Sequence, residues 1–78
     1  MCGLAGLVDW NAAMAPDARE RAVGAMIDRL EHRGPDDKGV WSDAVATLGH
    51  RRLAIIDLSP AGHQPMTSAC GRYVIAYN

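Results

Sequence analysis

Val40-Trp41-Ser42-Asp43-Ala44-Val45-Ala46-Thr47-Leu48 is the stretch of sequence that decides the fold of this chain. It contains two β-prone runs, Val40–Trp41 and Ala44–Leu48, separated only by Ser42-Asp43. Two such runs joined by a short polar link are typical of a β-hairpin. We therefore predict a hairpin here, although the chemistry of its turn is ambiguous, and read the remaining elements outward from it.

The segments after the hairpin are predicted to add further strands. Leu53-Ala54-Ile55-Ile56 is continuous and apolar, as expected of a strand that is covered on both faces. Residues 59–64 are predicted to form a loop, and Tyr73–Tyr77 the last strand. The sequence stops inside that strand-like run, whereas domains tend to end at exposed, polar positions. We therefore expect it to be a fragment cut within a larger domain.

The segment before the hairpin has the pattern of an amphipathic helix. Pro16 suits the first helical position, and the Asp17 carboxylate favours the positive end of the helix dipole. Apolar residues then recur at three- and four-residue spacing, which predicts a helix to about His32. Gly34-Pro35 would end it, and residues 36–39 are predicted to be a loop. The apolar positions of the helix are Ala22, Val23, Met26, Ile27 and Leu30.

The first residues complete the pattern of elements. Cys2–Val8 is predicted to be a short buried strand, and its two glycines permit close backbone approach. Asp9-Trp10-Asn11 is predicted to be a turn. The element order is therefore strand, helix and then several strands, without internal repeats. That order is typical of an α+β or layered α/β domain.

Length and composition limit the classes of protein that this chain can belong to. Its 78 residues make one small domain at most, with 49% hydrophobic residues, 22% charged residues and a net charge of −1. This balance argues against a nucleic-acid-binding protein and against a disordered tail. No stretch approaches the roughly 20 apolar residues of a membrane span, and no secretory signal is visible. We expect a cytoplasmic protein whose two cysteines form no structural disulfide.

Cys2 is the candidate nucleophile. Removal of Met1 would leave it with a free α-amine, whose pKa is about 7.7–8.0, beside a thiol whose pKa is about 8.5. One residue would then carry a nucleophile and a base of nearly matched pKa, which is a known arrangement in nucleophilic catalysis. Gly3 would leave room for a substrate beside the sulfur. On its own, however, a cysteine at this position is more often incidental than catalytic.

Five ordered motifs give Cys2 its context. Met1–Gly6 resembles the opening of class II glutamine amidotransferases, whose N-terminal-nucleophile domain begins with the catalytic cysteine. His32–Asp36 resembles the second signature of that family, and Gly49–Ser59 the third. Gly62–Met66 and Tyr77–Asn78 follow in the expected order. The Gly-Pro-Asp form of the second motif is most similar to asparagine synthetases.

The resemblance implies a role for each matching residue. Cys2 would attack the side-chain amide of glutamine, form a thioester and release ammonia. Arg52 would hold the glutamine α-carboxylate, for which a planar guanidinium is well suited. Alternation along a strand would point the neighbouring Arg51 to the opposite face. Asn78 would contribute its side-chain amide to the oxyanion hole. The glutamine would also be contacted by Asn78 and by the wall of the pocket, which comprises Leu53, Ala54, Ile55 and Ile56.

The resemblance also implies the wider organisation. Residues 1–78 would be part of a four-layer α/β/β/α sandwich, truncated on the C-terminal side. The parent would be an ATP-dependent asparagine synthetase that uses glutamine, aspartate and ATP, with ATP and Mg²⁺ bound in a second domain. Two alternatives stay open: another amide-forming amidotransferase with the same glutaminase, or a module that does no chemistry as isolated. The oligomeric state also stays open.

The remaining polar residues have simpler interpretations. His32, His50 and His63 lack neighbours at zinc-ligand spacing, so we expect no metal or other cofactor in these residues. Asp36 and Asp37 are most simply a solvated turn, although the family places this loop close to the active site. Cys70 is expected to be incidental. Neither a nucleic-acid nor a membrane partner is expected.

Overall fold

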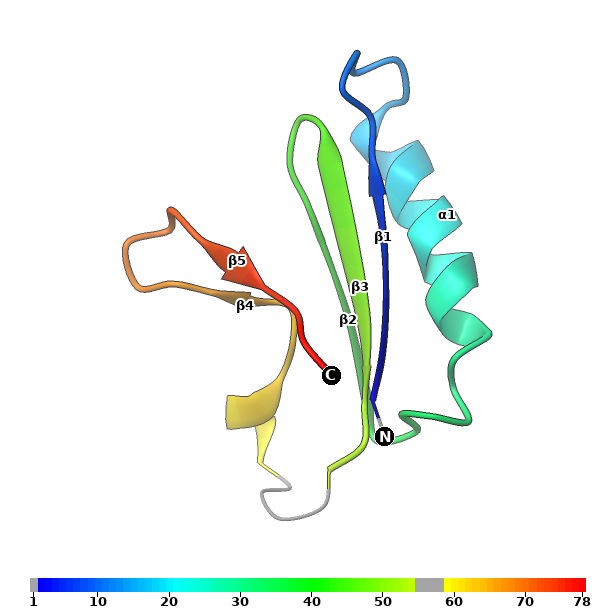
Figure 1. The fold of residues 1–78 in the computed structure, drawn as a ribbon, viewed down its shortest axis with the longest axis vertical. Helices are drawn as coiled ribbons and strands as arrows, with labels where there is room; N and C mark the ends of the chain where they lie inside the picture. Colours follow the sequence, from blue (N-terminus) through cyan, green and yellow to red (C-terminus); the bar gives the residue numbers. More distant parts are fainter. Residues whose placement is uncertain (1, 55–58) are drawn as a thin grey trace.

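The computed structural model describes residues 2–54 and 59–78, which form one α-helix and two small antiparallel sheets (Figure 1). The predicted α+β class is therefore confirmed. In chain order the elements are β1 (Gly3–Val8), α1 (Pro16–Asp28), β2 (Asp37–Ser42), β3 (Ala46–Arg52), the short 3-10 helix η1 (Pro60–Gly62), β4 (Met66–Thr67) and β5 (Val74–Ile75).

The predicted hairpin is the centre of the larger sheet. β2 and β3 pair antiparallel with Ser42 opposite Thr47, and β1 pairs with the other edge of β3, so that the strand order is β1-β3-β2. Asp43 resolves the ambiguous turn, because its Oδ1 accepts hydrogen bonds from the N–H groups of Val45 (2.9 Å) and Ala46 (2.8 Å). These bonds also hold the pKa of the Asp43 carboxyl below its ordinary value.

Strand pairing, rather than hydrophobicity, sets the strand ends. β2 already begins at Asp37, so the loop predicted over residues 36–39 is wrong after Asp36. β3 continues through polar residues to Arg52, which pairs with Asp37. The apolar strand predicted for Leu53–Ile56 is also wrong for Leu53 and Ala54, which lie beyond the paired ends of β1 and β2. Ile55 and Ile56 lie outside the described residues.

Helix α1 begins at Pro16 as predicted but ends at Asp28 rather than near His32. The N–H groups of Arg29 and Leu30 bond to carbonyls three residues back, which tightens the last turn and closes the helix. The chain then turns toward β3, where Gly34 is buried against the backbone of Arg51. A side chain at Gly34 would clash with that backbone, so the glycine is required for this close approach.

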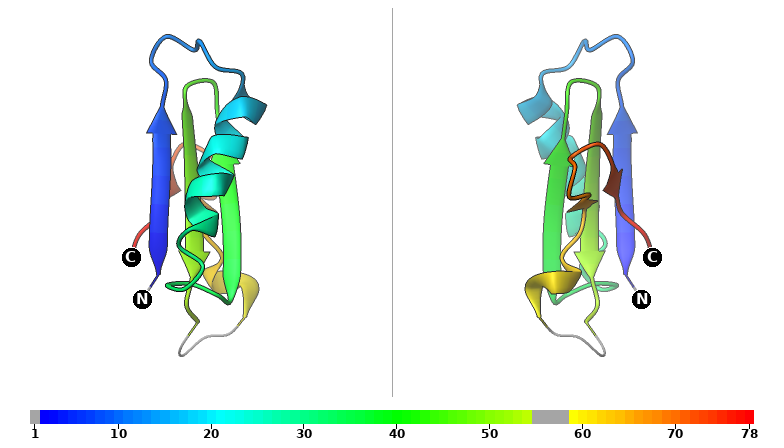
Figure 2. Two further views of the ribbon diagram at one scale, coloured as in Figure 1. Left: turned by 90° about the vertical axis from the view of Figure 1, so that its right-hand side faces the viewer. Right: turned by 90° about the vertical axis from the view of Figure 1, so that its left-hand side faces the viewer.

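The core lies between α1 and the sheet, on the face that Figure 2 shows covered by the helix. Val23 and Ile27 are its fully buried apolar residues, and both pack against Gly49 of β3. Met26, which shares the predicted apolar pattern, is 40% exposed. Arg19 is also fully buried; its Nε donates a hydrogen bond to Thr47 Oγ1 (3.1 Å). Its Nη1 and Nη2 donate to the carbonyls of Met14 and Asp43.

The opposite face of the sheet is only partly covered. The hairpin of β4 and β5 lies on this side, across the sheet from α1 (Figure 2). The predicted strand Tyr73–Tyr77 is shorter than expected, because only Val74 and Ile75 pair with β4. β1 is an edge strand with only Gly3 buried, so the expectation of a buried strand there is wrong. No helix among the described residues is long and apolar enough to cross a membrane.

Candidate active site

The two neighbouring arginines of β3 serve opposite faces of the sheet. Side chains alternate along a strand, so successive residues point to opposite sides. The Arg51 side chain lies on the α1 side, where its Nε donates a hydrogen bond to the Gly34 carbonyl (2.9 Å). Arg52 lies on the other side, close to Gly62 and the Ser59 carbonyl, to which its Nη1 donates (2.6 Å). The predicted alternation is therefore confirmed.

Cys2 lies directly before β1, with its thiol against the backbone that follows β3. The Leu53 N–H donates a hydrogen bond to Sγ (3.4 Å), and Sγ lies 3.9 Å from the Leu53 carbonyl oxygen. The cysteine is half-buried and forms no disulfide. Leu53 is flanked by Arg52 and Ala54, which both line a cavity. The thiol is thus held beside the segment that forms one wall of that cavity.

This cavity has a volume of about 270 Å³, and its lining mixes apolar surface with ionisable side chains. Arg52 is buried to 9% exposure and supplies its cationic wall. Gly62 allows the η1 segment to approach the guanidinium, since a Cβ there would lie 2.5 Å from Nη2. The lining residues are Asp36, Asp37, Arg52, Ala54, Pro60 and His63. One guanidinium, two carboxylates and one imidazole can together bind a small molecule that carries both charges.

Asp36 lies in an exposed bend, as expected from the sequence, whereas Asp37 is half-buried at the start of β2. Asp36 accepts a hydrogen bond from the Ala54 N–H (2.8 Å), and its own N–H donates to the Arg52 carbonyl (3.0 Å). Asp37 Oδ2 lies 2.6 Å from His63 Nδ1. Partial burial raises the pKa of Asp37, but His63, the Lys38 N–H and Arg52 outweigh it and hold the pKa below its ordinary value.

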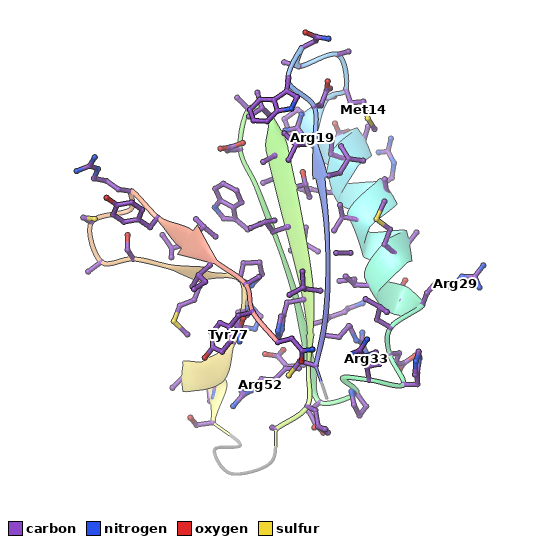
Figure 3. All side chains as sticks on the ribbon, in the orientation of Figure 1. Met14, Arg19, Arg29, Arg33, Arg52 and Tyr77 are labelled. Carbon is purple, nitrogen blue, oxygen red and sulfur yellow. The ribbon has the colours of Figure 1, made fainter. Side chains whose placement is uncertain are left out.

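The end of the chain returns to the same region as its start. Figures 1 and 2 show the N- and C-terminal ends close together at one end of the sheet. Figure 3 shows Arg52 and Tyr77 at that end. The Tyr77 N–H donates to Gln64 Oε1 (2.8 Å), and the Tyr77 carbonyl lies 3.0 Å from His50 Nε2. Asn78 follows directly and is exposed.

The structure therefore gathers most of the residues named from the sequence. Cys2, Arg52, Leu53 and Ala54 adjoin one another, whereas Ile55 and Ile56 lie outside the described residues. Sequence reasoning missed four residues that build or flank the cavity. Each lies in or next to one of the five motifs, which is the signal that could have identified them. They are Asp37, His50, His63 and Gln64.

Two further observations concern metal ligands and the second thiol. Across residues 2–54 and 59–78, no group of three or more His, Cys, Asp or Glu side chains could hold a metal ion. Cys70 is exposed between β4 and β5, with its Sγ 3.4 Å from Ser68 Oγ. Hydrogen bonds from Ser68 and from the Arg72 backbone lower the pKa of the Cys70 thiol.

Comparisons with known proteins cover the whole chain. The family described as a glutamine amidotransferase domain matches residues 1–78. Asparagine synthetase [glutamine-hydrolyzing] 3 of Bacillus subtilis is 39% identical over 80 residues, which cover 100% of this chain and 12% of that protein. Asparagine synthetase B of Escherichia coli is 35% identical over 78 residues, covering 100% of this chain and 14% of that protein.

A relative with a different name is also similar. The amidase chry2 of Gibberella zeae is 36% identical over 74 residues, which cover 83% of this chain and 11% of that protein. The chain thus spans about an eighth of the length of the curated relatives it matches. No solved structure matches it significantly.

Proposed function

Because the chain belongs to the glutamine amidotransferase domain family, near the asparagine synthetases, we propose that it is the glutamine-hydrolysing part of an ATP-dependent asparagine synthetase. The observation that carries the proposal is the Cys2 thiol beside a cavity that contains a buried arginine. In this proposal residues 1–78 are part of a longer glutamine amidotransferase domain. The helix and the larger sheet would be two layers of a four-layer α/β/β/α sandwich.

The proposed chemistry begins at Cys2 once Met1 has been removed. The α-amine accepts the thiol proton, and the sulfur attacks the side-chain carbonyl carbon of glutamine. Asn78 donates a hydrogen bond from its side-chain amide to the oxyanion that forms. The carbon–nitrogen bond breaks, ammonia leaves with the proton returned by the amine, and a thioester remains. Water attacks the thioester and releases glutamate and the free thiol.

Arg52 is proposed to recognise the α-carboxylate of glutamine. A guanidinium pairs with a carboxylate through two parallel hydrogen bonds, and burial strengthens that interaction. The cavity reaches from Arg52 to Ala54, next to the residue that contacts Cys2. Leu53, Ala54, Ile55 and Ile56 would form the wall along which the glutamine side chain extends toward the sulfur.

The acceptor half of the reaction is assigned to other residues. Aspartate and ATP with Mg²⁺ would bind a separate synthetase domain of the full-length protein, which would act in the cytoplasm. None of the 78 residues is assigned to these substrates. Ammonia released at Cys2 would be used there to amidate aspartate.

Another amide-forming enzyme is the second candidate. The family that matches the whole chain is described by its glutamine amidotransferase domain and by no acceptor, so the same glutaminase chemistry would serve a different acceptor equally well. The two candidates differ only in the acceptor. Measuring which carboxylic acid the full-length protein amidates with ATP and glutamine distinguishes them.

The nucleophile assignment is tested in the full-length protein with Cys2→Ala. We expect this variant to lose glutamine-dependent ammonia release, by about a thousandfold or more, because no covalent intermediate can form. Synthesis supported by free ammonia should continue, since it bypasses the thioester. Cys70→Ala removes the other, exposed cysteine and should leave both activities unchanged. Glutaminase activity retained in Cys2→Ala would contradict the assignment, and so would a Met1 that intact-mass analysis finds still attached.

A further inference from the structure

The backbone of Tyr77 is held on both of its polar sides by buried side chains. Its N–H donates to Gln64 Oε1 (2.8 Å), and its carbonyl oxygen lies 3.0 Å from His50 Nε2. His50 is fully buried and Gln64 is 7% exposed. Burying a polar side chain costs conformational entropy and desolvation free energy, and a hydrogen bond offsets that cost. Here two buried polar side chains are both bonded to the backbone of one residue. We call His50 and Gln64 together the Tyr77 clamp.

The clamp holds the backbone rather than the tyrosine side chain. The Tyr77 residue is 57% exposed, so burial of its ring does not explain why the chain is fixed at this point. The bond to Gln64 fixes the Ala76–Tyr77 peptide, and the contact with His50 fixes the peptide that connects Tyr77 to Asn78. The direction of that peptide determines where the Asn78 side chain can reach.

The geometry also assigns the donor in this contact. A carbonyl oxygen can only accept, so Nε2 of His50 carries the hydrogen that it donates to Tyr77. The Nδ1 atom is buried and has no hydrogen-bond partner within residues 2–54 and 59–78. Within the described part of the chain, the contact with the Tyr77 carbonyl is therefore the hydrogen bond of the His50 ring.

Both members of the clamp stand on the elements that carry the other proposed site residues. His50 lies on β3, directly opposite Leu4 of β1 and two residues before Arg52. Gln64 follows His63, whose ring approaches Gly39 of β2 so closely that a Cβ there would lie 2.7 Å from Nε2. The clamp therefore ties the last residues to the strands that position Cys2 and Arg52.

We propose that His50 and Gln64 are positioning residues that set the Asn78 amide against the oxyanion formed at Cys2. This inference rests on the proposed glutaminase function. The pair acts through the backbone on both sides of Tyr77 and does not touch glutamine. Its loss therefore lowers kcat for glutamine hydrolysis, because the oxyanion donor is displaced. The KM for glutamine stays nearly constant, because Arg52 and the cavity are not altered.

The test uses three variants of the full-length protein in a Cys70→Ser background, so that Cys2 is the thiol measured among the described residues. H50Q places an amide N–H near the position of His50 Nε2, whereas H50N places it near Nδ1, where the described residues offer no acceptor. Q64M keeps the size of Gln64 and removes its acceptor. We expect H50N and Q64M to lose about tenfold to a hundredfold in kcat, with H50Q close to the parent.

Three readouts separate positioning from a general structural role. The KM for glutamine should stay within about twofold of the parent value in each variant, a change of under about 0.5 kcal/mol in apparent binding. Alkylation of Cys2 by iodoacetamide, which needs no oxyanion hole, should proceed at the parent rate. Ammonia-dependent synthesis should be unchanged. The midpoint of thermal unfolding shows whether each variant is folded. If H50N does not fold, the kcat of Q64M alone tests the positioning role.

The outcomes distinguish this inference from the function on which it rests. An unchanged kcat in folded H50N or Q64M would overturn the proposed positioning role of His50 and Gln64. Equal losses of kcat in H50Q and H50N would overturn it as well. A rise in KM at constant kcat would also overturn it, since the pair would then act on glutamine binding. A parent protein without glutaminase activity, or with activity that survives Cys2→Ala, would instead refute the proposed function.

Discussion

His63 and Asp37 make a short contact in the lining of the cavity, with 2.6 Å between Nδ1 and Oδ2. The pair joins β2 to the segment that follows η1 and so fixes one wall of the cavity beside Arg52. The hydrogen bond from His63 is the largest of the effects that lower the pKa of Asp37. The contact therefore links the geometry of the cavity to the charge of one carboxylate.

A titration tests that link. The pKa of Asp37 lies below its ordinary value of 3.8, so its ionised form contributes stability at and above that pH. This contribution is lost as the pH falls through the lowered pKa. We expect the carboxyl ¹³C shift of Asp37 to titrate below that ordinary value, and to move up toward it in His63→Gln. An unchanged midpoint in His63→Gln would show that the contact does not stabilise the carboxylate.

At the residue scale, sequence reasoning succeeded where the signal was local. The opposite orientation of Arg51 and Arg52 follows from alternation along one strand, and the structure confirms it. The Asp37–His63 pair was missed because its members lie 26 residues apart and meet only after the chain folds. Such a pair leaves no periodic pattern in the sequence. Asp37 was therefore interpreted as part of a solvated turn, and His63 was considered only as a metal ligand and rejected.

At the scale of elements, the packing of α1 on β3 depends on one residue without a side chain, Gly49. Gly49 lies under Val23 and Ile27, and a Cβ there would approach Val23 Cγ1 to 2.6 Å and Ile27 Cγ2 to 2.8 Å. These are the only apolar side chains that are fully buried among the described residues. A change at Gly49 therefore separates the helix from the sheet at the centre of the core.

Two glycine substitutions should have opposite effects. Gly49→Ala should destabilise the folded protein by about 1–3 kcal/mol, because the added methyl group overpacks the core. Gly24→Ala, in the interior of α1 and with no atom within 4 Å of a built Cβ, should stabilise it by about 0.5–1 kcal/mol, because alanine favours the helix. Thermal or urea unfolding of the full-length protein measures both. Equal shifts of the same sign would contradict the packing described for Gly49.

The sequence correctly predicted that the helix and the hairpin exist, but it placed several of their ends wrongly. The periodicity of Val23 and Ile27 identified α1, and the β-prone runs identified the hairpin. The predicted end of the strand was wrong. The apolar residues predicted a strand over Leu53–Ile56, whereas the pairing of β3 with β1 and β2 ends at Arg52. Pairing partners decide where a strand stops, and a single segment of sequence does not contain them.

At the scale of the whole molecule, the chain has little interior. It extends over 40 × 31 × 16 Å, and Val23 and Ile27 are the fully buried apolar side chains. Ten large apolar residues, including Trp10 at 83% exposure, remain more than a third exposed among those described. The sequence indicated a small core from length alone, but the open face of the sheet became visible only with the strand order.

The isolated 78 residues should therefore unfold without a sharp transition. A chain of this size buries only about 60% of its unfolded surface, and here few of the buried groups are apolar. We expect a broad, weakly cooperative melting curve by circular dichroism and no measurable glutaminase turnover. A sharp transition would show that polar contacts such as those of buried Arg19 contribute more than expected.

The alternation of Arg51 and Arg52 has a consequence for how the domain can change over evolutionary time. Inserting or deleting one residue in β3 exchanges the two faces, so that Arg51 would turn to the cavity side and Arg52 to the α1 side, and neither would keep its present hydrogen bond. A two-residue change would preserve the faces but shift His50 away from Tyr77. Gaps should therefore be excluded from residues 46–52 in functional descendants of this chain, while the turn at residues 43–45 can vary in length.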